Sequence, residues 1–367
     1  MLNEKPMGEP AIFANIQLLR LLAALSVVLF HLSAYYPAGI GESVSITLSH
    51  YLGFFGVDVF FLISGFVMAK TTQSLSEYSD SIRFIVKRFY RIYISYWPFA
   101  LTFFLILAIF EQQEGRSLLG SLILIGVDFQ SLSLPIAWTL QFELLFYFGV
   151  FVFTFLPKRW MKFALIGVGV VVAAAQAYAI LLLNFYSMER FAEYPMSFLY
   201  FVSLFWFQFL AGFALFFFVS RVSLQGATIA VSVLVGTIYF AMSSQSAGEL
   251  LYSGSNIPER VLVGGVLAFS LLSFALYLEK VGFTVNHKLA AVCGDLSYAV
   301  YLGHLPVLFL LFYFMPNMGF YASLLITVTL TLVVSWLFHK LFEGPLLSRF
   351  DYTYNQVAKH FSKGCKA

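Results

Sequence analysis

The chain has 367 residues, of which 60% are hydrophobic and only 11% are charged, and its formal net charge is +3. A mean hydropathy of +0.87 over this length excludes an ordinary soluble domain and predicts an all-α polytopic membrane protein. The net charge does not indicate nucleic-acid binding, because the placement of Lys and Arg in a membrane protein reflects the orientation of its segments in the bilayer.

Ten apolar segments are long enough to cross a bilayer, and we expect them to form the helices of a single membrane domain spanning residues 1–367. The segments cover residues 16–36, 51–69, 92–110, 137–156, 162–184, 199–219, 226–243, 261–279, 296–314 and 320–341. Residues 117–129 are apolar but short, so we interpret them as an interfacial or re-entrant piece. The motif FEGP is expected to end the last helix, which leaves residues 342–367 as a short cytoplasmic tail.

The basic residues indicate the orientation of these segments. With the N-terminus inside, all but Arg116, Arg190 and Arg260 of the 21 Lys and Arg residues fall on the cytoplasmic side. The positive-inside rule therefore places both termini in the cytoplasm and the loop at 244–260 outside. The two cysteines show no paired spacing and no nearby histidine cluster, so neither a disulfide framework nor a metal site is predicted.

The first apolar segment contains LLRLLAALSVVLFHLS, in which Arg20 and His31 interrupt an otherwise lipid-like run. Ionisable residues inside a membrane usually face a bundle interior, a partner or water. Eleven helical steps place Arg20 and His31 on one face, about 16 Å apart. Alternatively, Arg20 extends to the headgroups and His31 is a hydrogen-bonded core histidine.

Two later motifs carry acidic residues at a depth similar to that of His31. GVDVFFLISGF places Asp58 about 10 Å below the outer surface, and WTLQFELLFY places Glu143 about 9 Å below it, with Tyr147 one turn deeper on the same face. Three titratable groups at one depth predict a functional cluster, although a lone buried carboxylate is more often a structural hydrogen-bond partner than a catalyst.

The motif KRFYRIYISYW supplies Lys87, Arg88 and Arg91 at the cytoplasmic end of the third segment. These residues satisfy the positive-inside rule, and such residues also occur as membrane anchors. Arg20 lies at the same end of the membrane, and clustered guanidinium groups bind phosphates through bidentate contacts. We therefore expect a site for a phosphorylated ligand.

Two weaker motifs supply further candidates. Ser64 and Gly65 lie at about the depth of Arg20 and offer a hydroxyl and a close-approach glycine, a pair that helix packing explains nearly as well. In GDLSYAVYLGHLP, Tyr298, Tyr301 and His304 recur every third residue and form one polar stripe, which either lines a substrate site or packs beside a kink at the proline.

Taken together, these motifs resemble those of the family 3 membrane acyltransferases, bacterial enzymes that O-acylate O-antigens, exopolysaccharides and related glycans. The resemblance covers nearly the whole chain and rests on the spacing of Arg20 and His31 followed by GVDVFFLISGF, KRFYRI, WTLQFELLFY and SYAVYLGHLP in this order. It implies an acyl-CoA donor, acetyl-CoA by default, that enters from the cytoplasm. It also implies a glycan or lipid-linked saccharide acceptor and a location in the bacterial inner membrane.

The same resemblance implies that His31 is catalytic and that Arg20, Arg88 and Arg91 serve the donor. As a general base, His31 would take a proton from the acceptor hydroxyl, with Asp58 or Glu143 fixing its tautomer, or it would form an acyl-histidine intermediate. Candidates for stabilising the oxyanion are Trp138 and Tyr147.

A different class of function is also compatible with these residues. A proton-coupled transporter or a lipid or glycan flippase could relay protons through His31, Asp58 and Glu143. The sequence shows no visible repeat symmetry of the kind common in transporters, and the shared depth of three ionisable residues disfavours a non-catalytic scaffold. The acyl group, the acceptor sugar and the oligomeric state are not indicated.

Overall fold

The computed structural model describes residues 13–37, 43–73, 75, 78–127, 129–181, 203–243 and 258–364. The helices are α1 (Ala14–Ser33), α2 (Val44–Leu52), α3 (Phe55–Gln73), α4 (Tyr78–Ile109), α5 (Leu118–Ile123), α6 (Trp138–Phe153), α7 (Lys158–Leu181), α10 (Phe205–Phe217), α11 (Leu224–Ser243), α13 (Pro258–Lys280), α14 (His287–Phe314), α15 (Phe320–Phe338) and α16 (Gly344–Gly364). Short 3-10 turns occupy Phe129–Ser131, Pro135–Ala137 and Val219–Arg221, and a π-helical turn occupies His339–Glu343.

The predicted all-α membrane fold is confirmed. Within the described residues there is no strand, and seven helices are long and apolar enough to cross a membrane. Three shorter apolar helices lie within α7, α10 and α11, so every one of the ten expected segments contains a helix. The ends of two of those segments, Arg190 and most of the loop at 244–260 lie outside the described residues.

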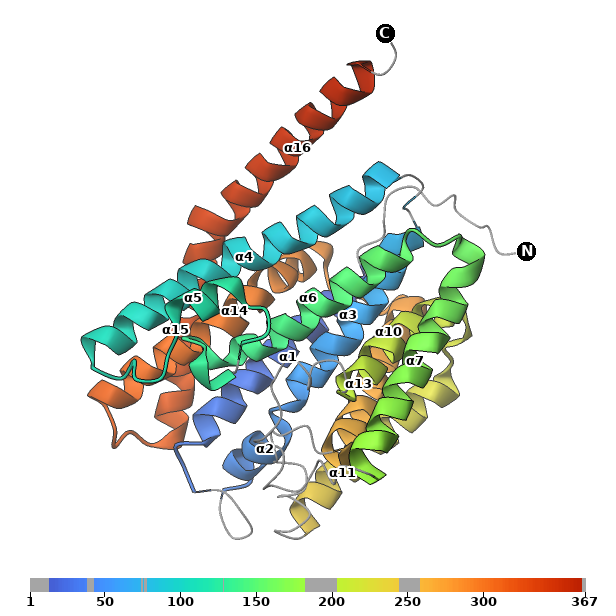
Figure 1. Ribbon diagram of the computed structural model, residues 1–367. Helices are drawn as coiled ribbons and strands as arrows, with labels where there is room; N and C mark the ends of the chain where they lie inside the picture. Colours follow the sequence, from blue (N-terminus) through green and yellow to red (C-terminus); the bar gives the residue numbers. More distant parts are fainter. Residues whose placement is uncertain are drawn as a thin grey trace.

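Helices α1 and α3 occupy the middle of the bundle (Figure 1). Helix α1 packs between α3 and α14, while α10 and α13 cover the other side of α3. The close approach of α3 and α10 depends on glycine: an added Cβ at Gly65 would lie 1.9 Å from the carbonyl oxygen of Phe209, and one at Gly212 would lie 1.9 Å from that of Leu62. Small residues at such positions let helix backbones approach in membranes.

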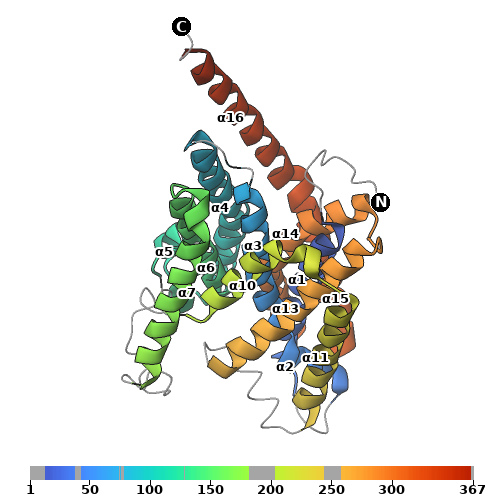
Figure 2. The same cartoon turned by 90° about the vertical axis from the view of Figure 1, so that its right-hand side faces the viewer.

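Helix α16 extends away from the bundle beside the first turns of α4 (Figures 1 and 2). The expected helix end at FEGP does not occur, because the π-helical turn at His339–Glu343 joins α15 to α16. Helix α16 is fixed to α4 by an ion pair between Lys87 and Asp351 and by stacking of Tyr90 on Phe350, with ring centroids 4.0 Å apart.

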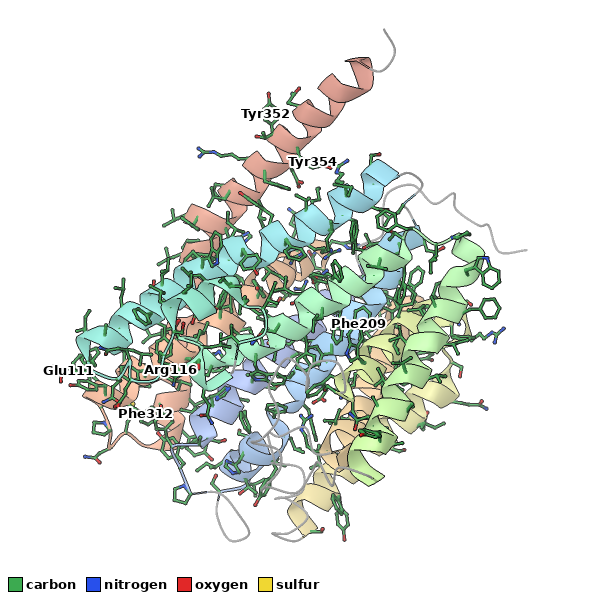
Figure 3. All side chains as sticks on the ribbon, in the orientation of Figure 1. Glu111, Arg116, Phe209, Phe312, Tyr352 and Tyr354 are labelled. Carbon is green, nitrogen blue, oxygen red and sulfur yellow. The ribbon has the colours of Figure 1, made fainter. Side chains whose placement is uncertain are left out.

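Residues 351–353 and 356 of α16 are exposed. Figure 3 shows Tyr352 and Tyr354 on the helix beyond the bundle, and Tyr352 is 68% exposed. The guanidinium of Arg83 lies 5.5 Å from the centre of the Tyr354 ring, so α4 and α16 stay in contact along this extension. The basic end of α4 is thereby held next to the C-terminal helix.

Candidate active site

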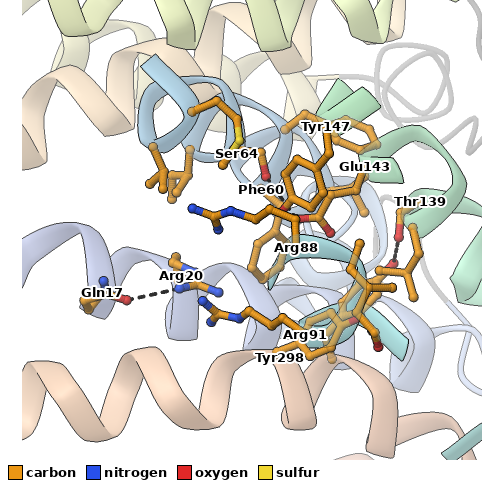
Figure 4. A pocket seen from close by; sticks show the side chains of 18 residues that line it. Gln17, Arg20, Phe60, Ser64, Arg88, Arg91, Thr139, Glu143, Tyr147 and Tyr298 are labelled. Carbon is orange, nitrogen blue, oxygen red and sulfur yellow. Dashed lines mark hydrogen bonds between the residues drawn. The ribbon is translucent and has the colours of Figure 1, made fainter. Parts of the chain in front are cut away.

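Three arginines from two helices converge on one cavity of about 190 Å³ (Figure 4). Arg20 comes from α1, and Arg88 and Arg91 come from α4, three residues apart on one face. Glu143 of α6 is the one acidic residue in the described cavity wall, which therefore carries three positive charges against one negative charge. Such an excess of positive charge in a partly buried cavity favours binding of an anion.

The remaining lining consists of apolar side chains with a few hydroxyl and amide groups. These residues are Gln17, Val57, Phe60, Phe61, Ile63, Ser64, Val67, Met68, Ile92, Thr139, Leu140, Tyr147, Tyr298 and Tyr301. Gln17 accepts a hydrogen bond of 3.2 Å from Arg20, and this contact holds the guanidinium toward the cavity.

Glu143 is bound within this cavity by neighbouring hydroxyl groups. Tyr147 donates a hydrogen bond to its carboxylate, and the Ser64 hydroxyl lies 3.5 Å from the same oxygen. The guanidinium of Arg88 lies 5.5 Å from the centre of the Tyr147 ring. Glu143 therefore belongs to the arginine cavity, and its described hydrogen bonds do not include His31.

A second cavity of about 340 Å³ shares two of these arginines. Arg88 and Arg91 line both cavities, and Lys87 lines the second. The second wall also includes the π-helical turn, where Glu343 accepts hydrogen bonds from Ser95 and, at 2.8 Å, from His339. π-helical turns are frequent at functional sites.

His31 lies near the opposite end of α1 from Arg20. Helix α1 is continuous between them, so the expected separation of about 16 Å follows from the helical rise. The neighbour of His31 across the helix interface is His304 of α14, with ring centroids 5.1 Å apart.

His304 is fully buried, and its Nδ1 lies 2.7 Å from the carbonyl oxygen of Tyr301. Tyr301 in turn lines the arginine cavity, and its hydroxyl lies 2.8 Å from that of Thr139. The stripe expected in GDLSYAVYLGHLP thus runs from the cavity to His31.

The structure gives Asp58 partners other than the expected His31. Arg260, at the start of α13, donates two hydrogen bonds to its carboxylate, of 2.8 and 2.6 Å, and Gln208 of α10 donates a third of 2.6 Å. Both Asp58 and Arg260 have no exposed surface. Asp58 is therefore held by a buried ion pair between α3 and α13, and its described contacts do not include His31.

The sequence did not indicate that Arg260 is buried in the bundle, because its position predicts the end of an external loop. The signal that could have found it is the buried charge itself: an aspartate inside a membrane segment requires a partner, and Arg260 lies at the same end of the membrane. The aromatic ring of Phe54 lies 4.1 Å from the guanidinium and completes this buried site. Gly264 leaves room for the Asp58 carboxylate, since an added Cβ at this position would lie 2.7 Å from that group.

Two other predicted site residues lie in packing positions. Gly65 contacts the backbone of α10 and is not part of the described cavity wall. Trp138 lies among aromatic rings, with Phe205 at 5.6 Å and Phe142 at 5.8 Å between centroids. Among the residues that the structure describes, no group of three or more His, Cys, Asp or Glu could hold a metal ion.

Fold and cavity together define a polytopic membrane protein with an arginine-lined cavity inside its helix bundle. Comparison with known proteins gives its class. The family model described as an acyltransferase domain, Acyl_transf_3, matches residues 13–340, so the chain belongs to this acyltransferase family.

One curated relative is the "Exopolysaccharide production protein ExoZ" of Rhizobium meliloti (strain 1021), which is 28% identical over 269 residues. The match covers 69% of this chain and 76% of ExoZ. No solved structure shows significant similarity to the chain.

Proposed function

We propose that the protein transfers an acyl group, acetyl by default, from cytoplasmic acyl-CoA to a hydroxyl of an exopolysaccharide or a related surface glycan. We place this reaction in the bacterial inner membrane. The observation that carries the proposal is the convergence of Arg20, Arg88 and Arg91 in one cavity whose described wall holds a single carboxylate. Membership of an acyltransferase family supports acyl transfer, and the name of the relative ExoZ supports exopolysaccharide as the acceptor class.

We assign the two cavities to the two parts of an acyl-CoA molecule. Arg88 and Arg91 lie where the cavities meet, so their forked donors can bind phosphates from either side. The second cavity would receive the nucleotide: its wall holds Lys87 beside the two arginines, together with the carboxylates of Asp295, Glu343 and Asp351. The first cavity, which has the smaller volume, would receive the pantetheine arm, which is long enough to span the roughly 16 Å toward His31.

At the far end of the arm, neutral His31 takes the proton from the acceptor hydroxyl as its oxygen attacks the thioester carbonyl carbon. The carbon–sulfur bond breaks, a new ester bond forms, and the thiolate leaves and takes a proton to become the free CoA thiol. General-base catalysis of this kind contributes typically 10²–10⁴-fold, and the rest of the rate comes from positioning the two substrates.

Donor binding and acyl transfer can be tested separately. Purified protein in detergent is titrated with CoA by calorimetry, and surface glycans from cells with and without the protein are compared by mass spectrometry. We expect saturable CoA binding and a mass increment of one acyl group per modified sugar, which also identifies the acyl group. Absence of CoA binding by folded wild-type protein would contradict the proposed donor, and unchanged glycan masses would contradict the proposed acceptor.

A further inference from the structure

The immediate neighbour of His31 is a second histidine with one unused nitrogen. His304 is fully buried, and its Nε2 has no hydrogen-bond partner among the described residues. Buried polar side-chain atoms are hydrogen-bonded in the large majority of cases, so an exception inside a helix bundle calls for an explanation.

The other nitrogen of His304 determines which tautomer is present. Its Nδ1 lies 2.7 Å from the Tyr301 carbonyl oxygen, and a carbonyl can only accept, so Nδ1 carries the hydrogen. In the neutral ring, Nε2 then holds a lone pair and can act only as an acceptor. The backbone of α14 thus holds a hydrogen-bond acceptor inside the bundle.

The two rings lie close enough for a hydrogen bond to form between them, although none joins them in this structure. The centroids of His31 and His304 lie 5.1 Å apart. Two imidazole rings joined by a hydrogen bond of ordinary length have centroids roughly 5 Å apart. A general-base histidine needs a partner on one nitrogen so that the lone pair of the other faces the substrate.

The carboxylates that could have served as this partner are bound elsewhere. Asp58 accepts hydrogen bonds from Arg260 and Gln208, and Glu143 accepts one from Tyr147 in the arginine cavity.

We infer that His304 is the positioning residue of His31: once substrate is bound, Nε2 of His304 accepts the N–H of His31, so that the second nitrogen of His31 faces the acceptor hydroxyl. Hydrogen bonds between catalytic groups are often long or misaligned in the free enzyme and tighten in the substrate complex. The inference rests on the proposed function, because it assigns a partner to the proposed base. His304 stays neutral in this arrangement and transfers no proton itself. Its contribution is to fix the tautomer and the ring orientation of His31.

Two substitutions separate this role from a purely structural one. In His304→Asn, the amide N–H replaces Nδ1–H and can still bind the Tyr301 carbonyl, but the shorter side chain has no acceptor at the Nε2 position. In His304→Gln, the longer side chain places an amide oxygen near that position. Positioning by Nε2 predicts that Gln retains more transfer activity than Asn, whereas a role limited to the Tyr301 contact predicts the reverse order.

The experiment measures acyl transfer and donor KM for wild type and both variants at equal protein level in native membranes. We expect His304→Asn to lower kcat by about 10–100-fold with donor KM unchanged, and His304→Gln to lie between Asn and wild type. Transfer by His304→Asn equal to or above that by His304→Gln, or a change in donor KM without a change in kcat, would overturn the inference.

A combination with His31→Gln provides the second test, and it also applies if His304→Asn fails to accumulate. Because His304 acts through His31, adding His304→Gln to His31→Gln should cause no further loss of residual transfer. An additional loss equal to that in the wild-type background would overturn the inference. Failure of wild-type protein to bind CoA would instead contradict the proposed function, so the two failures are distinguishable.

Discussion

Replacing Arg260 by methionine should destabilise the protein strongly, because it removes one member of a buried ion pair. In the intact protein, Arg260 donates hydrogen bonds of 2.8 and 2.6 Å to an Asp58 carboxylate that has no exposed surface. Arg260→Met leaves that carboxylate with the Gln208 amide as its remaining described side-chain donor. Breaking a buried pair from one side typically costs about 3–5 kcal/mol, because the other charge stays buried without compensation.

The double variant Asp58→Asn with Arg260→Met is the matched control. It removes both charges, while the amide that replaces the carboxylate can still bond to Gln208, and paired replacement of a buried ion pair is often close to neutral. Thermal unfolding in detergent, followed by intrinsic fluorescence, should show a large loss for the single variant and recovery of most of it in the double variant. A single variant as stable as wild type, or a double variant less stable than the single, would refute the ion-pair account.

The same double variant tests the predicted catalytic role of Asp58. If Asp58 serves only to join α3 and α13, acyl transfer should survive in the double variant once its stability has recovered. A stable double variant without transfer activity would return Asp58 to the catalytic mechanism.

Three further predictions concern the donor site, the helix packing and the topology. Replacing Arg88 and Arg91 by Ala should weaken CoA binding at least tenfold without loss of folding, and Lys at these positions should restore binding only in part, because the forked donors are lost. Calorimetry compares this variant with a control that lacks two exposed basic residues on the same side of the membrane, and equal CoA affinity in both would contradict the proposed donor site. Gly65→Ala should lower the free energy of unfolding by about 1–3 kcal/mol or more, because the added methyl would lie 1.9 Å from the Phe209 carbonyl oxygen. Unchanged stability in thermal unfolding would contradict this close packing of α3 and α10. Cys365 should resist a membrane-impermeant thiol reagent in intact cells and react after lysis, and labelling in intact cells would overturn the predicted cytoplasmic C-terminus.

Much of the fold follows from hydropathy, because a bilayer requires long apolar helices and the chain supplies them as separate runs. The arginine cavity was predictable in part for a similar reason. Arg88 and Arg91 share a helix face by their spacing, and Arg20 lies at the same end of the membrane, so local periodicity and depth suffice to bring them together.

The lateral positions of the acidic residues could not be predicted in this way. Depth along a helix gives one coordinate, whereas the partner of a side chain depends on helix rotation and on which helices are neighbours. Asp58 and His31 have matching expected depths, yet Asp58 faces Arg260, which is 202 residues away in the sequence. Likewise, Gly65 follows Ser64 directly, but only Ser64 lines the cavity, while Gly65 packs against α10.

The most direct test of the proposed mechanism is acyl transfer by His31→Ala, measured at equal protein level in the membrane together with CoA binding. His287→Ala, which removes an exposed histidine at the start of α14, is the control. The proposed mechanism predicts normal CoA affinity, because the arginine cavity lies about 16 Å away along α1, and a loss of transfer of about 10²–10⁴-fold that the control does not show. Transfer by His31→Ala at the wild-type rate would contradict the proposed mechanism and remove His31 from it.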